Sequence, residues 1–221
     1  MLAVHNLTKR YSRNGAEFSA LSDVSLNVGN GEFAVISGHS GSGKSTLLNI
    51  IAGLLKADGG TVTLDATELT GLDDGAMSRL RNERIGFIPQ GHSVLANLTV
   101  IENVCLPRYL HSRKDNASEL ATELLRKTGI ENLANQYPAQ LSGGELRRAS
   151  IARALLNEPT LIIADEPVSD LDSANAEKIM RIFSDAAESG TTVLIVTHSD
   201  AGLANIDCRR FEMQNGGLTE I

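Results

Sequence analysis

Cysteine is scarce in this chain, whose 221 residues include only Cys105 and Cys208. The two cysteines match no metal-binding spacing and imply no disulfide framework, so a reducing, cytosolic setting is expected. Long apolar runs are missing too: the longest, such as residues 161–164 and 193–196, have only the length of strands. A helix that crosses a bilayer needs about 20 apolar residues. If the protein works at a membrane, another chain must therefore span it.

Basic residues are outnumbered by acidic ones. The sequence contains 20 Lys and Arg against 27 Asp and Glu, which gives a net charge of −7. A chain that binds nucleic acid through its overall charge is expected to be basic, so nucleic acid is not an expected partner. The length and the 42% hydrophobic content are those of one α/β domain with room for a small subdomain.

What the chain does contain is a phosphate-binding loop pattern. Residues 38–46 read Gly-His-Ser-Gly-Ser-Gly-Lys-Ser-Thr and fit G-x-x-x-x-G-K-[ST] without a mismatch. Glycines let the backbone N–H groups wrap around phosphate, Lys44 can reach the β- and γ-phosphates, and the Ser45 hydroxyl can hold Mg²⁺. A helix that begins at about Lys44 would direct its positive end at the anion. The residues expected to hold nucleotide here are Gly38, Ser40, Gly41, Ser42, Gly43, Lys44, Ser45 and Thr46.

Two acidic residues end a strand-like apolar run. Leu161 to Ala164 are followed by Asp165 and Glu166. In phosphate-loop enzymes an Asp at such a strand end holds the Mg²⁺ shell, and a neighbouring Glu can deprotonate the attacking water. The pattern alone also fits ordinary strand ends, and it gains its meaning from the phosphate loop that precedes it.

A third pattern, Leu141-Ser142-Gly143-Gly144-Glu145, comes directly before a predicted helix. Ser142 with Glu145 three residues later makes a capping box, which is its structural interpretation. Two glycines at a helix start also leave backbone N–H groups open to an anion. Together with the phosphate loop upstream and the acidic pair downstream, this peptide resembles the signature of the ATP-binding cassette (ABC) ATPases.

The resemblance extends from Tyr11 to His198 with the motifs in the family's order, and it implies further roles. Tyr11 would stack on adenine, although by itself it could equally be a core residue at a strand end. Gln90 would sense Mg²⁺ and the attacking water, so that Ser45, Gln90 and Asp165 together organise the metal. His198 would contact the γ-phosphate. The resemblance thus implies four catalytic residues, which are Lys44, Gln90, Glu166 and His198.

The resemblance also implies a second copy of the chain. Ser142, Gly143 and Gly144 would complete the nucleotide site of that copy, and Asp172 would lie in a loop that contacts it. Two ATP molecules, with Mg²⁺, would then lie between two head-to-tail subunits. An additional positive helix end near the γ-phosphate stabilises charge that is otherwise crowded. Closing and opening of the dimer would follow the nucleotide.

The order of elements predicts an α/β fold: a phosphate-loop NTPase core with a mainly parallel sheet, an N-terminal antiparallel β subdomain and an inserted α-helical subdomain. As a single ABC ATPase domain of residues 1–221, the chain would form its nucleotide-binding core from 1–89 and 154–221. Residues 90–153 would form the helical subdomain with the signature. Turns are expected at Asn14-Gly15 and at residues 58–60.

Within the family the sequence resembles exporter-type ATPases of the lipoprotein-releasing, macrolide-efflux and cell-division branch, through residues 20–25, 80–87 and 98–104. This implies an ATP-hydrolysing subunit, peripheral at the cytoplasmic face of the cell (inner) membrane. There it would couple dimer closure to an integral membrane permease subunit, for export or for force transmission. The transported substrate is not encoded in this chain.

The sequence departs from that branch in three places. Leu146-Arg147-Arg148 follows the signature where Arg/Lys-Gln-Arg is usual. Pro89 and Gly91 flank Gln90 where aromatic residues are common, and residues 168–170 are Val-Ser-Asp instead of Thr-Gly-Asn. No catalytic position is lost, so these departures bear on the subgroup and leave the expectation of ATP hydrolysis intact.

Two alternatives remain to be weighed. A soluble ABC ATPase that acts on nucleic acid or ribosomes would carry a long coiled coil before the signature, or two cassettes in one chain, and neither pattern is present here. A phosphate-loop kinase or GTPase would have no use for residues 141–145, and no Asn-Lys-x-Asp guanine-binding peptide occurs. The first alternative is the stronger of the two.

Overall fold

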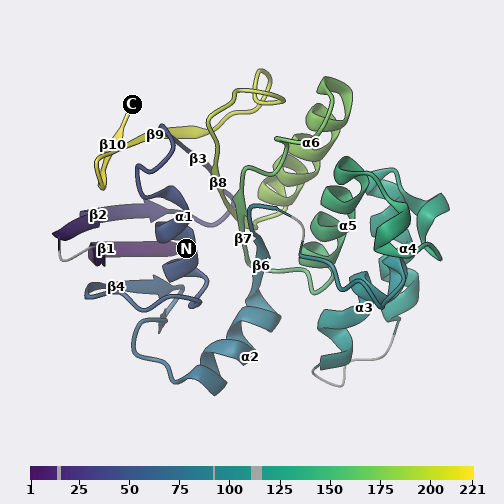
Figure 1. The fold of residues 1–221 in the computed structure, drawn as a ribbon, viewed down its shortest axis with the longest axis horizontal. Coiled ribbons are helices and arrows are strands. Elements are labelled where there is room, and N and C mark those ends of the chain that lie inside the picture. Colours follow the sequence, from purple (N-terminus) through teal and green to yellow (C-terminus); the bar gives the residue numbers. More distant parts are fainter. Residues whose placement is uncertain (14–15, 92, 111–115) are drawn as a thin grey trace.

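The computed structural model describes residues 1–13, 16–91, 93–110 and 116–221 and contains two sheets (Figure 1). The first sheet has the order β2-β1-β4-β5 and is antiparallel throughout. Its strands are β1 (Leu2–Arg13), β2 (Ala16–Val28), β4 (Gly59–Leu64) and β5 (Thr67–Glu68). The turn expected at Asn14-Gly15 lies outside the described residues.

The second sheet has the order β10-β9-β3-β8-β7-β6, and all of its pairs are parallel except β9 with β10. Its strands are β3 (Phe33–Ser37), β6 (Ile85–Ile88), β7 (Leu161–Asp165), β8 (Thr192–Val196), β9 (Arg209–Gln214) and β10 (Gly217–Glu220). The mixed architecture confirms the predicted α/β fold, with an antiparallel N-terminal sheet beside a mainly parallel one.

Helix α1 (Lys44–Ile51) lies in the apolar core between the two sheets, and α6 (Ser173–Glu188) covers the other face of the second sheet. Side chains along β3 point alternately to the two faces of the sheet. Ala34 and Ile36 therefore belong to the core with α1, while Phe33 and Val35 belong to the core with α6. Because both faces are covered, the central strands β3, β7 and β8 are apolar except at a strand end, where Ser37, Asp165 and Thr192 lie.

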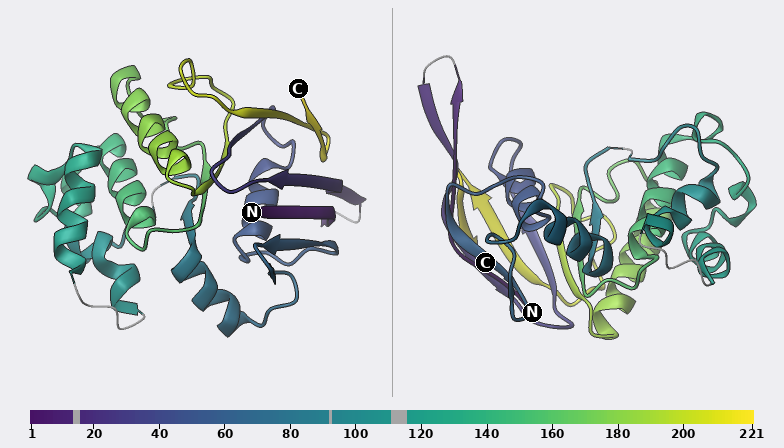
Figure 2. Two further views of the ribbon diagram at one scale, coloured as in Figure 1. Left: turned by 180° about the vertical axis from the view of Figure 1, so that it is seen from behind. Right: turned by 90° about the horizontal axis from the view of Figure 1, so that it is seen from below.

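Helices α3 (Val100–Leu110), α4 (Ala117–Thr128) and α5 (Gly143–Leu155) pack around an apolar cluster of their own. Figure 2 shows them gathered at the end of the molecule opposite to β1 and β2. Helix α2 (Asp74–Arg84) leads into β6. The division of the chain into a nucleotide-binding core and a helical subdomain at residues 89/90 and 153/154 stays a prediction. Helix α5 continues through the second of these boundaries.

The turn predicted at residues 58–60 is wrong in its second half, because Gly59 and Gly60 belong to β4. Gly60 has a φ of +84°, and a Cβ there would lie 2.5 Å from the carbonyl oxygens of His5 and Asn6. The glycine therefore allows β4 to approach β1 closely, and does not mark a reversal of the chain. No described helix combines the length and apolarity needed to cross a membrane.

Candidate functional site

The parallel strands bring the predicted site residues to one edge of the second sheet. The phosphate loop follows β3, His198 follows β8, the acidic pair ends β7, and Gln90 follows β6. These four strands are neighbours in the order β3-β8-β7-β6. Ligands of open α/β sheets bind outside the carboxyl ends of the strands, so the topology alone assembles the site.

A cavity of about 720 Å³ lies at this edge. It is lined by residues of the β1–β2 hairpin, the phosphate loop and the three neighbouring strand ends: Tyr11, Phe18, Ala20, Ser40, Gly41, Ser42, Gly43, Lys44, Ser45, Thr46, Gln90, Asp165, Glu166 and His198. The structure thus unites all of the expected catalytic residues in one cavity.

The loop at residues 38–46 has the shape of an anion cradle. A Cβ at Gly41, whose φ is +81°, would meet no atom within 4 Å, so this glycine borders open space. Gly43, with a φ of +114°, has no room for a Cβ, which would lie 2.3 Å from the Ala20 carbonyl oxygen. Gly43 also caps α1 without a side-chain hydrogen bond, so the first N–H groups of the helix are left for a ligand.

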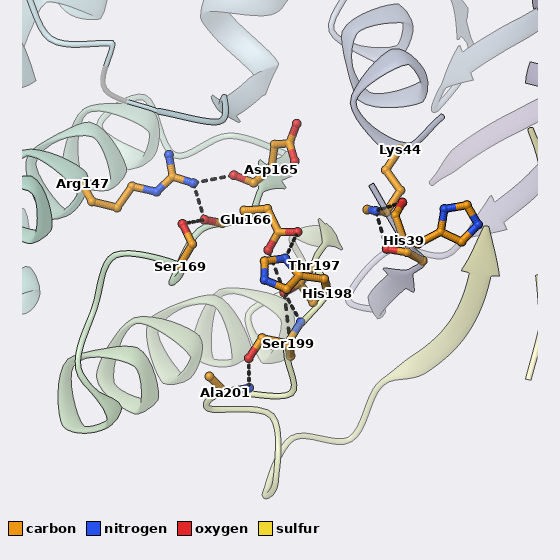
Figure 3. A network of polar contacts seen from close by, with 11 residues as sticks. His39, Lys44, Arg147, Asp165, Glu166, Ser169, Thr197, His198, Ser199 and Ala201 are labelled. Atoms are coloured by element: carbon orange, nitrogen blue, oxygen red, sulfur yellow. Dashed lines mark hydrogen bonds and ion pairs between the residues drawn. The ribbon is translucent and has the colours of Figure 1, made fainter. Parts of the chain in front are cut away.

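Lys44 is held within the loop. Its Nζ donates hydrogen bonds to the carbonyl oxygens of Gly38, at 2.5 Å, and His39, at 3.0 Å (Figure 3). Gly38 itself is not among the residues that line the cavity; its φ is +151°, and a Cβ there would lie 2.4 Å from the Met213 carbonyl oxygen. Gly38 thus supports Lys44 through its carbonyl group.

Asp165 and Ser45 form the pair of oxygen donors that suits Mg²⁺. Asp165 is only 5% exposed, and burial raises the pKa of its carboxyl group above the ordinary value, while a hydrogen bond with Ser45 acts in the opposite direction. Mg²⁺ in proteins is commonly held by one or two carboxylates together with substrate phosphates. A buried carboxylate next to a hydroxyl group fits this ion, because the cation replaces the solvation that burial removes.

Glu166 is held from two sides. Its Oε1 lies 2.6 Å from His198 Nδ1, and its Oε2 accepts a hydrogen bond of 3.0 Å from the Thr197 hydroxyl (Figure 3). Glu166 is 7% exposed and has a φ of +48°, an unusual conformation for a residue with a side chain. The Glu166 carboxylate is thus held in a defined position at the cavity.

A sequence profile described as ABC transporter matches residues 21–169 of the chain. The chain belongs to the ABC transporter family. Two structures of the cassette MJ0796, one described as a dimeric post-hydrolysis state bound to ADP and Pi and one as a dimeric bacterial ABC transporter cassette, share 39% identity and a TM-score of 0.94. The alignment covers 100% of this chain and 98% of each of theirs. A nucleotide-free ATP-binding cassette from an ABC transporter shares 28% identity with a TM-score of 0.81, over 100% of this chain and 90% of that one.

The family expected from the sequence motifs is therefore confirmed. As an ABC ATPase, the chain hydrolyses ATP with Mg²⁺ as the metal cofactor. Its phosphate loop, with Ser45, and the strand-end residues Asp165 and Glu166 lie together in the cavity.

The signature residues of this ABC ATPase lie elsewhere. Ser142, Gly143 and Gly144 are not among the residues that line the cavity. Ser142 caps α5: its hydroxyl accepts from the Glu145 N–H at 3.4 Å, and its own N–H donates to the Glu145 carboxylate at 2.7 Å. Asp172 also lies outside and caps α6, accepting from the Asn175 N–H at 2.9 Å. The capping box predicted for Ser142 is thus realised within one subunit, and Asp172 also serves as a helix cap.

Two residues that line the cavity, Ala20 and Phe18, were not indicated as site residues by the sequence motifs, and the aromatic one is Phe18. Its ring stacks on that of Tyr11, with the centroids 5.6 Å apart, and both rings line the cavity. The two residues are cross-strand partners of β1 and β2. A two-residue hairpin turn at residues 14–15 sets Tyr11 opposite Phe18. The strand register could therefore have indicated Phe18 from the sequence.

Proposed function

We propose that this chain is the ATP-hydrolysing subunit of an ABC-type membrane complex, in which two copies close head to tail around two ATP molecules and drive a transmembrane partner. Export or force transmission is the work that this partner would do. The observation that carries the proposal is the division of the motifs: one cavity unites the phosphate loop with Glu166, while the signature helix end stands apart from it.

Each residue of the cavity then has a defined part. Lys44 and the N–H groups of the loop hold the phosphates, and the Tyr11–Phe18 pair offers an aromatic surface to adenine. Ser45, Gln90 and Asp165 would hold Mg²⁺, which supplies charge neutralisation on the phosphate oxygens. Glu166 accepts a proton from water while the water oxygen attacks the γ-phosphorus. The bond between the γ-phosphorus and the bridging β-phosphate oxygen breaks, and ADP and phosphate are the products.

The head-to-tail dimer is supported by the signature itself. The N-terminus of α5 carries a positive dipole end with two glycines, Gly143 and Gly144, and its cap consists of the Ser142 hydroxyl and the Glu145 carboxylate. MJ0796, which covers the whole of this chain at a TM-score of 0.94, is described as dimeric. A second subunit's triphosphate is the anion that we assign to this helix end.

Replacing Ser142 with Asp tests the dimer. Asp is as good an N-cap as Ser, so α5 is expected to stay folded, while a carboxylate facing the partner's γ-phosphate repels it by several kcal/mol. In a Glu166→Gln background, we expect ATP-dependent dimer formation to weaken at least about tenfold by size-exclusion chromatography with light scattering. Asn116→Asp adds the same charge at the start of α4 and is expected to leave dimerisation unchanged. A fully dimeric Ser142→Asp protein would contradict the proposal.

Coupling to a membrane partner is supported by the segment after Gln90. A groove of about 520 Å³ lies between α2, β6, α3 and α5, and its lining includes Asn82, Phe87, Pro107 and Leu110. Leu110 is 67% exposed although it is apolar. The segment that follows Gln90 therefore ends at a groove with an exposed leucine at its edge and with Arg81 and Arg153 in its lining. A cytoplasmic helix of an integral membrane protein with apolar and acidic residues suits this groove.

Purification from detergent-solubilised membranes tests this coupling. We expect the tagged chain to retain an integral membrane protein, identified by mass spectrometry, and we expect Leu110→Glu to reduce its recovery at least fivefold. Leu54→Glu, which introduces the same charge at an exposed leucine near the end of α1, serves as the control. Recovery of ribosomal proteins or nucleic acid in place of a membrane protein would favour the soluble alternative and contradict the proposal.

A further inference from the structure

Arg147 is the largest fully buried side chain of the described residues, at 1% exposure. It lies on α5, two residues after the end of the signature. Its guanidinium group donates five hydrogen bonds, and all five end on main-chain carbonyl oxygens. Burial lowers the pKa of this group from its ordinary value. A buried charge is costly unless its hydrogen bonds are satisfied, so the full set of acceptors is what makes the position stable.

The acceptors fall into two groups that belong to the two sides of the catalytic cavity. Nη1 donates to Pro89, at 2.5 Å, and to Gly91, at 3.0 Å, the residues on either side of Gln90. Nη2 donates to the carbonyl oxygens of Asp165 and Glu166, and Figure 3 shows Arg147 reaching both. Nε adds a bond of 3.2 Å to Pro167. One planar group therefore ties the backbone around Gln90 to the backbone of the acidic pair.

The tied segments have backbone conformations that need support. Glu166 has a φ of +48°, and Gly91 has a φ of +82°. Such conformations persist where the surrounding structure enforces them. The Arg147 bonds to the carbonyl oxygens of these two residues provide that enforcement. Lys, with a point charge and no planar fork, cannot reach both groups of acceptors at once.

We propose that Arg147 is a positioning residue, which fixes Gln90 relative to Glu166 and makes their alignment depend on the orientation of α5. The inference rests on the proposed function for the roles of Gln90 and Glu166. Ser142 caps the same helix, so a movement of the signature end reaches both residues through a single side chain. Arg147 is one of the departures from the family pattern, in which Gln is usual at this place.

The test compares Arg147→Lys and Arg147→Gln with Ile151→Val and Ile151→Ala. Ile151 is fully buried one turn further along α5 and belongs to the apolar core with α6. Its variants therefore supply a control protein whose melting temperature is lowered as much as that of the Arg147 variants. For both Arg147 variants we expect ATP affinity and KM within threefold of the parent. We expect kcat to be lower by about ten- to a hundredfold, because a small misalignment of reacting groups lowers the rate by this much. The Ile151 variants are expected to keep kcat within twofold.

A double-variant cycle shows whether Arg147 acts through Gln90. In a Gln90→Ala background, the loss of kcat caused by Arg147→Lys is expected to shrink at least threefold, because the residue to be aligned is gone. An unchanged loss in that background, an unchanged kcat of both Arg147 variants, or an equal loss in an Ile151 variant of the same melting temperature would overturn the inference. If Glu166→Gln is inactive while the Arg147 variants are fully active, the proposed function stands and this inference fails.

Discussion

Replacing Glu166 with Gln is expected to lower the rate of ATP hydrolysis by about 10²- to 10⁴-fold, the usual contribution of a general base. Gln keeps the size of the side chain and can still accept from the Thr197 hydroxyl, which lies 3.0 Å from Oε2. The substitution removes the negative charge next to His198 and, with it, the capacity to take a proton from water. ATP binding is expected to remain within threefold, and the bound ATP is expected to hold two subunits together.

Three measurements check this variant: steady-state phosphate release, equilibrium ATP binding, and size-exclusion chromatography with ATP. Glu188→Gln makes the same chemical change at an exposed position near the end of α6 and is expected to behave as the parent. Hydrolysis by Glu166→Gln within threefold of the parent rate would remove Glu166 from the role of base. Loss of ATP binding would show that the carboxylate serves the fold of the site instead.

Replacing Lys44 with Gln is expected to weaken ATP binding and to lower kcat/KM by at least about 10²-fold. The ammonium group is the one cationic side chain that the phosphate loop contributes to the cavity, and removing a preorganised donor of this kind costs about 10²- to 10³-fold. Its anchoring to the carbonyl oxygens of Gly38 and His39 places the charge before ATP arrives. Preorganisation of this kind raises the electrostatic contribution.

Binding of a fluorescent ATP analogue and steady-state hydrolysis measure the effect. Lys56→Gln removes the same charge at an exposed position after α1 and is expected to change neither quantity by more than twofold. A Lys44→Gln protein with unchanged ATP affinity and turnover would show that the loop N–H groups alone hold the triphosphate. Thermal unfolding of both variants separates loss of the charge from loss of the fold.

The parts of the fold and site that the sequence predicted are those encoded by local patterns. The phosphate loop, the start of α1 at Lys44 and the end of β7 at Asp165 each depend on a few consecutive residues. The convergence of these segments followed from parallel strand order. The roles of the site residues stay predictions until the variants above are measured.

The features that the sequence did not predict depend on distant partners. Strand β5 has only two residues and exists through its pairing with β4. The conformation of Gly60 is set by the approach of β1. Arg147 bonds to Pro89, 58 residues away in the chain, and to Pro167, 20 residues away. Side-chain type near the signature carries no information about such contacts, because the acceptors are carbonyl groups that every residue has.

Enclosure of α1 between the two sheets divides the molecule into a fixed and an adjustable portion. Leu47, Leu48 and Ile51 are fully buried in a core that both sheets share, so the helix that begins at the phosphate loop cannot tilt without unpacking that core. The helices α3, α4 and α5 share an apolar cluster of their own, and of their described residues only those of α5 also reach the core with α6, through Ile151, so a shift of these helices would disturb less packing. In the proposed cycle we therefore expect phosphate release to shift these helices relative to the two sheets, while α1 keeps its place at the bound nucleotide.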